Sequence, residues 1–259
     1  MFRKLKEIYD YREMLNGLIK KTLRTRYKGS FLGFLWTFVN PLLQLAVYAT
    51  IFPLILRVQV PNYAMFLFVA LLPWTGFVTS LSGGLSCVIE HSSLVKKIYF
   101  PRMILPISVA ATYILDYIYC IPILIMALIL SKVPITVFIL FVPIVILTQF
   151  IFTSAICLII SSVNVRFRDL QQIVGILTLA WLYFTPILYD ITFVPEQYRK
   201  LLLIFNPMAG IMGAYRDSMF YGKLPDMFGL VAAFVISIIL FIIGFVVFHK
   251  LERTFAEDL

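Results

Sequence analysis

Three cations and a tyrosine lie within five residues of one another near the start of the chain, and phosphate is the ligand that suits them. This basic cluster consists of Arg24, Arg26, Tyr27 and Lys28. Guanidinium and ammonium groups bind phosphate oxygens by charge-assisted hydrogen bonds, and arginine does so with a planar, two-pronged donor. We predict that the basic cluster contacts the phosphate or diphosphate of a lipid head group. The alternative is that its charges only anchor the chain to an anionic membrane surface.

The residues for most enzyme chemistry are missing. The sequence has no Gly-rich loop ending in Lys-Ser or Lys-Thr, so it does not bind nucleotide by that device. His91 and His249 have no zinc-ligand spacing around them. Cys87, Cys120 and Cys157 have no paired spacing, and we interpret them as small apolar packing residues. We expect this chain to bind no cofactor, no metal and no nucleic acid, and to have no enzymatic activity of its own.

One carboxylate falls well inside an apolar stretch. Asp116 recurs at four-residue spacing with Ser108, Thr112 and Cys120, so the four share one stripe of a helix. A buried carboxylate within a membrane is a candidate functional group, and a role in transport is one interpretation of Asp116. The other is a hydrogen bond between helices that fixes their packing. Proton-coupled transport is disfavoured because it needs more such groups.

Aromatic residues make up 16% of the chain, and three of them are candidates for contacts with sugar. Trp36 begins one apolar stretch, and Trp181 and Tyr183 lie together in another. Rings that line a wet passage suit a glycan, because the C–H faces of sugars stack on them while hydroxyls stay hydrated. The alternative is that these rings face lipid, fill the core or sit at the membrane interface.

The elements that position these residues are membrane helices. Hydrophobic residues form 61% of the sequence, its mean hydropathy is +0.96, and only 14% of residues are charged. A bilayer core of about 30 Å needs roughly 20 apolar residues in a helix, and lipid offers no hydrogen-bond partners to any other backbone. We predict an all-α polytopic membrane protein with six transmembrane helices, at residues 32–56, 63–87, 103–130, 135–163, 170–189 and 228–248.

The chain divides into an N-terminal helix, at residues 1–30, and a transmembrane domain, at residues 31–259. Apolar residues recur at helical spacing among the N-terminal cations, which predicts an amphipathic helix bent near Asn16-Gly17. It lies either in the membrane surface or on a cytoplasmic partner. No cleavable signal peptide is expected. No stretch outside the spans exceeds about 40 residues, so a soluble catalytic domain of ordinary size does not fit.

The distribution of positive charge orients the chain. Nine of its 22 Lys and Arg residues precede the first span, and with six crossings 16 of the 22 fall on the same side. Cytoplasmic loops carry the excess of such residues. We therefore expect both termini in the cytoplasm.

Three connecting segments stand out. Residues 88–102 form a polar link with a short helix that ends near Tyr99, before Pro101, and residues 164–169 form a charged turn. The external segment 190–223 is partly apolar and is interrupted at Asn206-Pro207. Each half is too short to span a bilayer. We predict two short re-entrant helices, with a solvated loop as the alternative.

Four motifs in order resemble the type 2 ABC exporter permeases that move polysaccharides. The first runs from the basic cluster through Ser30, Leu32 and Gly33 to Trp36, followed by Asn40-Pro41. Gly29 departs from that motif, where a longer polar residue is expected. The others are Leu94-Val95-Lys96-Lys97-Ile98-Tyr99-Phe100-Pro101-Arg102, then Arg166-x-Arg168-Asp169-Leu170, and then Thr185-Pro186-Ile187, Val194-Pro195 and Asn206-Pro207-Met208.

The resemblance implies a multi-pass permease of the bacterial plasma (inner) membrane that works as a homodimer on two cytoplasmic ATPase subunits, which bind ATP and Mg. Its substrate is a lipid-linked glycan of the O-antigen, capsule or teichoic acid type. The basic cluster then lies at the lipid head group, and Trp36, Trp181 and Tyr183 line the glycan channel. Eight residues form the ATPase coupling and gate region: Glu90, Lys96, Lys97, Phe100, Arg102, Arg166, Arg168 and Asp169.

Two other classes share part of this pattern. A type 2 ABC permease for drugs or other lipids has the same fold but lacks the first motif. A membrane-embedded glycan transferase needs paired acidic residues on a cytoplasmic loop to hold a metal, and the sequence has none.

Overall fold

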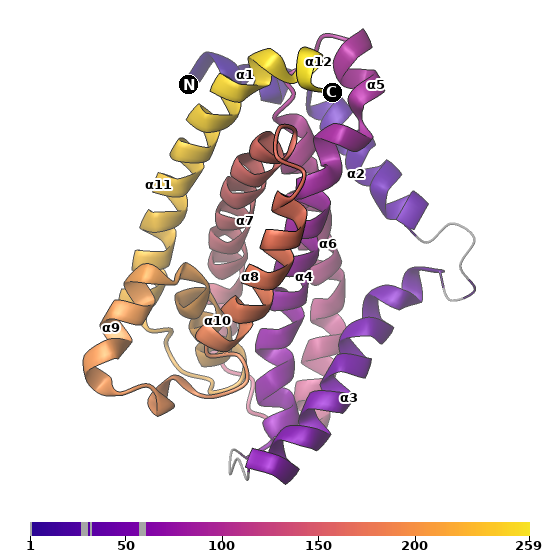
Figure 1. The fold of residues 1–259 in the computed structure, drawn as a ribbon. Coiled ribbons are helices and arrows are strands. Elements are labelled where there is room, and N and C mark those ends of the chain that lie inside the picture. Colours follow the sequence, from indigo (N-terminus) through magenta and orange to yellow (C-terminus); the bar gives the residue numbers. More distant parts are fainter. Residues whose placement is uncertain (1, 27–30, 32, 57–60) are drawn as a thin grey trace.

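The computed structural model describes residues 2–26, 31, 33–56 and 61–259, and all regular elements in these residues are helices (Figure 1). This confirms the all-α class. Tyr27 and Lys28 of the basic cluster lie outside the described residues, as do Gly29, Ser30 and Leu32.

Four helical stretches are long and apolar enough to cross a membrane within the described part of the chain. They are α4 (Tyr63–Glu90), α6 (Ile104–Leu130), the combined stretch Val137–Asn164, and Met227–Thr254. The third joins the short 3-10 helix η2 (Val137–Phe141) to α7 (Val142–Asn164), and the fourth contains α11 (Met227–Leu251). They match the second, third, fourth and sixth predicted spans.

Helices also occupy the first and fifth predicted spans. The helix α3 (Trp36–Leu56) follows a single 3-10 turn, η1 (Gly33–Leu35). The helix α8 (Leu170–Phe184) is apolar but has only 15 residues, so it ends earlier than the predicted residue 189. Its end has a local cause: Thr185 has an extended backbone, which is the conformation favoured immediately before a proline such as Pro186.

The N-terminal segment forms two helices, α1 (Phe2–Asp10) and α2 (Arg12–Arg26), which meet at Tyr11. The predicted bend near Asn16-Gly17 is therefore wrong, because α2 continues through both residues. The buried side chains Leu18 and Ile19 lie on α2, which packs against α6 of the same chain. This intrachain packing provides the partner for the apolar face of α2.

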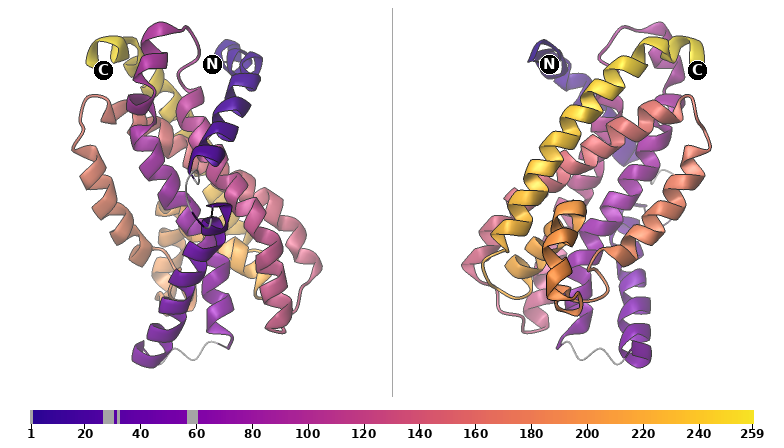
Figure 2. Two further views of the ribbon diagram at one scale, coloured as in Figure 1. Left: turned by 90° about the vertical axis from the view of Figure 1, so that its right-hand side faces the viewer. Right: turned by 60° about the vertical axis from the view of Figure 1, so that its left-hand side comes forward.

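The two ends of the helix bundle hold different elements (Figures 1 and 2). Both chain termini lie at one end, the terminal end, together with α1, the short helix α5 (Ser92–Lys97) and the last helix α12 (Phe255–Asp258). The other, the far end, holds α9 (Glu196–Phe205) and α10 (Pro207–Met219). Two 3-10 helices, η3 (Ile191–Phe193) and η4 (Glu252–Thr254), complete the fold.

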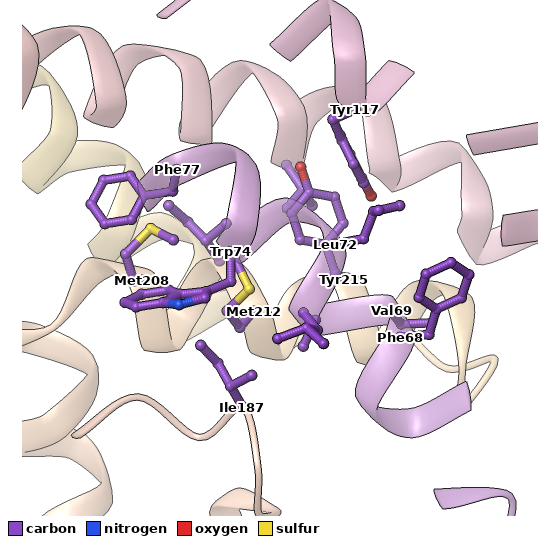
Figure 3. Packing of buried hydrophobic residues seen from close by; sticks show 14 of the residues in the cluster. Phe68, Val69, Leu72, Trp74, Phe77, Tyr117, Ile187, Met208, Met212 and Tyr215 are labelled. Carbon is purple, nitrogen blue, oxygen red and sulfur yellow. The ribbon is translucent and has the colours of Figure 1, made fainter. Parts of the chain in front are cut away.

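The main core lies between α4, α6, α7, α10 and α11, and Figure 3 shows the part of it that α4 forms with α6 and α10. Trp74 and Phe77 of α4 lie beside Met208 and Met212 of α10. A Cβ atom added at Gly210 would stand 2.4 Å from the carbonyl oxygen of Gly229, so α10 meets α11 backbone to backbone. The far end is therefore fastened to the last long helix through a contact that needs glycine.

A stripe of small residues also brings α4 close to α7. A Cβ atom on Gly84 would stand 2.8 Å from the sulfur of Cys157, whose thiol donates to the Ser80 carbonyl oxygen at 3.4 Å. Small residues at four-residue spacing let membrane helices approach in this way. Cys157 is fully buried, which agrees with the predicted packing role of the cysteines.

Candidate functional site

A cavity of about 540 Å³ lies between α3, α4 and α6, and we name it the α3–α4–α6 cavity. It is lined by polar and aromatic side chains as well as apolar ones: Trp36, Thr37, Asn40, Pro41, Leu43, Gln44, Leu72, Thr75, Gly76, Thr79, Tyr113, Asp116, Tyr117 and Cys120. The structure thus brings together two residues that the sequence singled out separately, Trp36 and Asp116.

Asp116 lies at the middle of its helix. It is twelve residues from Ile104 and fourteen from Leu130, which places it about 18 Å and 21 Å along the axis from the two ends. Its side chain is 7% exposed and lines the cavity wall. The other members of its stripe, Ser108, Thr112 and Cys120, are buried too. A carboxylate in this position is costly in lipid, which favours a polar environment in the cavity.

The other two aromatic candidates lie elsewhere. Trp181 belongs to a ring cluster on α4, α7 and α8, where its centroid is 5.3 Å from that of Phe77 and 6.0 Å from that of Phe152. Tyr183 is 60% exposed on the outer face of α8. Within one copy of the chain, the structure therefore does not bring Trp36, Trp181 and Tyr183 to one surface.

The basic cluster begins on α2. Arg24 is exposed on the last turns of this helix, and Arg26 is its final residue. The segment that follows leads to η1 and Trp36, where the α3–α4–α6 cavity begins. The cations that we predict to hold phosphate thus immediately precede, along the chain, the helix that lines the cavity.

The predicted coupling segment is a short helix between two long ones. Glu90 ends α4 and accepts a hydrogen bond from Ser86, and α5 carries Lys96 and Lys97 exposed in its last turn. The expected helix before Pro101 is confirmed. Lys97 is followed by two exposed apolar residues, Ile98 at 57% and Tyr99 at 81%.

Phe100 differs from the other residues of this segment because it is buried. It is only 4% exposed and packs in a second apolar cluster with Val95, Phe248 and Phe255. Phe167, in the turn between α7 and α8, is 67% exposed and was not singled out from the sequence. The exposed apolar residues of the two turns are therefore Ile98, Tyr99 and Phe167, while Phe100 fixes the segment to the bundle.

The last residues of the chain connect the two turns at the terminal end. Arg102 donates to the carbonyl oxygen of Glu252. Arg166 donates to the Asp258 carboxylate at 3.0 Å and to the Thr254 hydroxyl at 3.1 Å. The hydrogen bond from Thr254 and the charge of Arg166 lower the pKa of Asp258 below its usual range. We call residues 249–259 the C-terminal clasp. Arg168 and Asp169, beside Arg166, are exposed.

A second hydrogen-bonded junction fixes the far end. The side-chain oxygen of Asn206 accepts the indole N–H of Trp181 at 2.9 Å, and its amide donates to the Thr185 hydroxyl at 3.0 Å. Asn206 separates α9 from α10, as predicted. Its amide thereby ties the turn between these helices to the end of α8.

Arg216 is a residue whose role the sequence analysis missed. It is 3% exposed, so it is not the solvated loop charge that the count of cations assumed. Its guanidinium donates to the carbonyl oxygens of Phe66, Pro186, Ile187 and Tyr189, and lies 3.6 Å from the centre of the Phe66 ring. The available signal was a single arginine directly after fifteen residues without charge, 201–215. Such a residue is costly to bury unless its donors are satisfied.

The fold and the cavity define the class: a multi-pass α-helical membrane protein with a polar cavity between its helices. A family model described as "ABC-2 type transporter" matches residues 15–220. The chain belongs to this family, and it is therefore a transporter subunit of the permease type. This confirms the family resemblance seen in the sequence.

Alignments with curated relatives cover all or nearly all of the chain. It is 39% identical to the O-antigen export system permease protein RfbA of Myxococcus xanthus, and the alignment covers all of both chains. It is 35% identical to a protein of the same name from Klebsiella pneumoniae, over 95% of each chain.

Proposed function

We propose that this chain is the membrane-spanning permease subunit of an ATP-driven exporter of lipid-linked polysaccharide, with an O-antigen-type glycan as the substrate. The observation that carries the proposal is its 39% identity, over the full length, to a permease named for O-antigen export. The first sequence motif supports the same conclusion, because permeases for drugs or other lipids are expected to lack it.

The proposed topology has six spans in a bacterial plasma membrane, with both termini in the cytoplasm. Four helical stretches are each long and apolar enough to cross the membrane. The helix α3 has 21 residues and supplies the first span, and α8, with 15 residues, supplies the fifth together with the turn that follows it. The terminal end is then cytoplasmic, in agreement with its many cations.

In this topology α9 and α10 are the external, re-entrant helices. Nearly every residue of α10 is buried, and its close contact with α11 supports a place inside the bundle. Leu201, Ile204 and Phe205 of α9 are exposed and apolar, which suits contact with lipid.

The chain works as a homodimer with two cytoplasmic ATPase subunits. ATP and Mg bind to those subunits. Their docking surface comprises α5 and the α7–α8 turn, where exposed cations stand beside Ile98, Tyr99 and Phe167. Arg102 and Arg166 transmit the movement of the ATPase subunits to the C-terminal clasp, and Phe100 transmits the same movement to the helix bundle.

The substrate is divided between two environments. The basic cluster holds the phosphate of the lipid head group at the cytoplasmic surface, and the lipid tail stays in the bilayer. Trp36, Trp181 and Tyr183 contribute to the glycan path of the assembled dimer. Exposed Tyr183 is available at a surface that a second copy can complete.

Deletion of the gene, followed by complementation, tests the function. We expect deletion to abolish the surface glycan while lipid-linked glycan accumulates inside the cell, and the intact gene to restore export. Purified protein free of copurifying ATPase should not hydrolyse ATP. Normal surface glycan after deletion, in a cell with no second copy of the system, would overturn the proposed function.

A further inference from the structure

The α3–α4–α6 cavity has a lining that neither a lipid tail nor an anion suits. It surrounds Asp116, about 18 Å from one end of α6, so it lies at a depth where lipid tails are the ordinary neighbours. The amides of Asn40 and Gln44 are exposed in the lining, and hydrocarbon would offer them no hydrogen-bond partner, which is costly. An anion is disfavoured because the lining includes a carboxylate and neither Lys nor Arg. Water, a cation and a neutral, polar ligand remain, and the amide N–H donors of the lining favour the neutral ligand over the cation.

The hydrogen-bonding groups of the lining favour a ligand with several hydroxyls. On α4, the hydroxyls of Thr75 and Thr79 already donate to the carbonyl oxygens of Leu72 and Thr75, at 2.8 and 2.7 Å. Their oxygens are therefore left as acceptors toward the cavity, and Asp116 adds carboxylate acceptors. A ligand that meets these groups must donate, and hydroxyl groups do so.

Across the cavity, α3 supplies groups that both donate and accept. Asn40 and Gln44 are one helical turn apart, exposed, and part of the lining. Each amide offers two N–H donors and one carbonyl acceptor. A pair of amides facing a row of acceptors matches the alternating donors and acceptors of a sugar ring.

The remaining requirement is a flat surface for the apolar face of a sugar. Trp36 of α3 and Tyr113 of α6 are aromatic members of the same lining, whereas the ring of Tyr117 is only 3% exposed and packs against Tyr215. The volume of about 540 Å³ lies within the range of small-molecule sites, which is roughly 300–1,000 Å³.

We propose that the α3–α4–α6 cavity is a carbohydrate subsite within each copy of the chain. It binds a neutral, hydroxyl-rich sugar unit of the glycan and rejects phosphate, which the basic cluster takes. The proposal rests on the proposed function, since it names the part of the exported molecule that this cavity recognises. Asp116, Asn40 and Gln44 are its specificity-determining residues.

Protection of a cysteine against alkylation measures binding directly. Thr79 lines the cavity and is exposed, so Thr79→Cys provides the reporter, whereas the three native cysteines are buried. The full chain is placed in nanodiscs and treated with a small neutral maleimide. The probes are the oligosaccharide released by mild acid from the surface glycan of the same cell, and inorganic phosphate. We expect the oligosaccharide to slow labelling and phosphate to have no effect.

Variants of the lining then locate the site. Gln44→Leu removes a polar partner of the ligand, and Asp116→Asn replaces one carboxylate acceptor with a donor. Each, combined with the reporter, should weaken protection roughly fivefold or more. The matched control is Thr50→Val, on the same helix but outside the lining. Equal protection by phosphate, or no change with either lining variant, would overturn the subsite.

The outcome also separates this proposal from the proposed function. If the oligosaccharide gives no protection while Gln44→Leu and Asp116→Asn cells export normal amounts of glycan, the cavity holds only water and the export function stands. If deletion of the gene leaves surface glycan unchanged, the proposed function fails instead, and the subsite with it.

Discussion

Arg166 and Asp258 lie 92 residues apart in the sequence and form an ion pair with a distance of 3.0 Å between Nε and Oδ2. The pair fastens the C-terminal clasp to the turn between α7 and α8, and Arg102 fastens the same clasp to the segment that follows α5. Phe255 of the clasp is 1% exposed and packs in the apolar cluster that contains Phe100 and Phe248. Two segments that the sequence analysis places in one coupling region are thus held by one short tail.

We predict that Asp258→Asn frees this tail. A spin label on Arg253→Cys, an exposed position of the clasp, should gain mobility in the variant, because the asparagine amide cannot replace the charge that Arg166 faces. Electron paramagnetic resonance of the labelled chain in nanodiscs measures the change. Glu196→Gln, a carboxylate removed at the far end, is the control and should leave the spectrum as it is.

Acid should have the same effect as Asp258→Asn. The pKa of Asp258 is lowered in the fold, so its contribution to holding the clasp is present above the ordinary carboxyl pKa of about 3.9 and is lost as pH falls through the lowered value. Label mobility should therefore rise at that acidic step in the parent chain and stay flat in Asp258→Asn. A titration without this difference would contradict the ion pair as the fastening.

The second prediction separates docking from folding among the aromatic residues of the two turns. Phe167→Ala removes an exposed ring and should weaken binding of the ATPase subunit without lowering the melting temperature. Phe100→Ala removes a buried ring and should destabilise the chain by roughly 3–5 kcal/mol. Copurification with the tagged ATPase and thermal unfolding in detergent measure the two effects. Reversed results would show that Phe100 is the docking residue.

The third prediction concerns Arg216. Arg216→Lys retains a charge but cannot reach the four carbonyl oxygens that the guanidinium bonds, and an unsatisfied buried group costs about 1–3 kcal/mol. We expect a clear fall in melting temperature. Arg199→Lys is the matched control, because Arg199 also donates to carbonyl oxygens, those of Thr192 and Val194, but at the surface. Equal effects would mean that burial of Arg216 is not what matters.

The fourth prediction tests whether α9 enters the membrane. Ile204 is 45% exposed and Gln197 is exposed as well, so a cysteine at either position is open to its surroundings. If those surroundings are lipid at Ile204 and water at Gln197, a membrane-impermeant thiol reagent should label Gln197→Cys quickly and Ile204→Cys slowly in whole cells. Fast labelling of both would indicate a solvated loop.

The positions of the elements were predictable because each is set by local sequence. Apolar length placed the long helices, and prolines marked breaks between shorter ones, since α5 ends four residues before Pro101 and α10 begins at Pro207. The errors were also local: α8 ends at Phe184 because Thr185 precedes a proline, and the N-terminal break falls at Tyr11 although Gly17 is the better helix breaker.

The junctions between elements were not predictable, because they depend on which surfaces meet. In the sequence, Arg216 is one more loop cation. Only the folded structure shows that the Phe66 ring and carbonyl oxygens, such as that of Pro186, surround it. Trp36 and Asp116 have no relation in the sequence and come together only because α3 packs on α4 beside α6. The basic cluster and the coupling surface remain predictions from sequence.

The last prediction distinguishes a phosphate site from a membrane anchor at the basic cluster. Under simple anchoring each cation contributes about 1 kcal/mol near an anionic surface, and loss of one is nearly silent because other cations precede it. If the cluster holds a diphosphate, the planar fork of arginine matters and a point charge does not replace it. Arg24→Lys and Arg26→Lys retain charge but lose the fork, so each should reduce export several-fold more than neutralisation by Lys6→Gln does.

Surface glycan per molecule of permease in the membrane, compared across the three variants, is the measurement. Arg24 and Lys6 are both exposed on the N-terminal helices, so neither substitution opens a cavity that would disturb folding. Matched amounts of each variant in the membrane exclude an effect on insertion. Equal export by all three would leave only the anchoring role for these cations, and a larger defect in Lys6→Gln would show that charge near the start of the chain, and not the arginine fork, limits export.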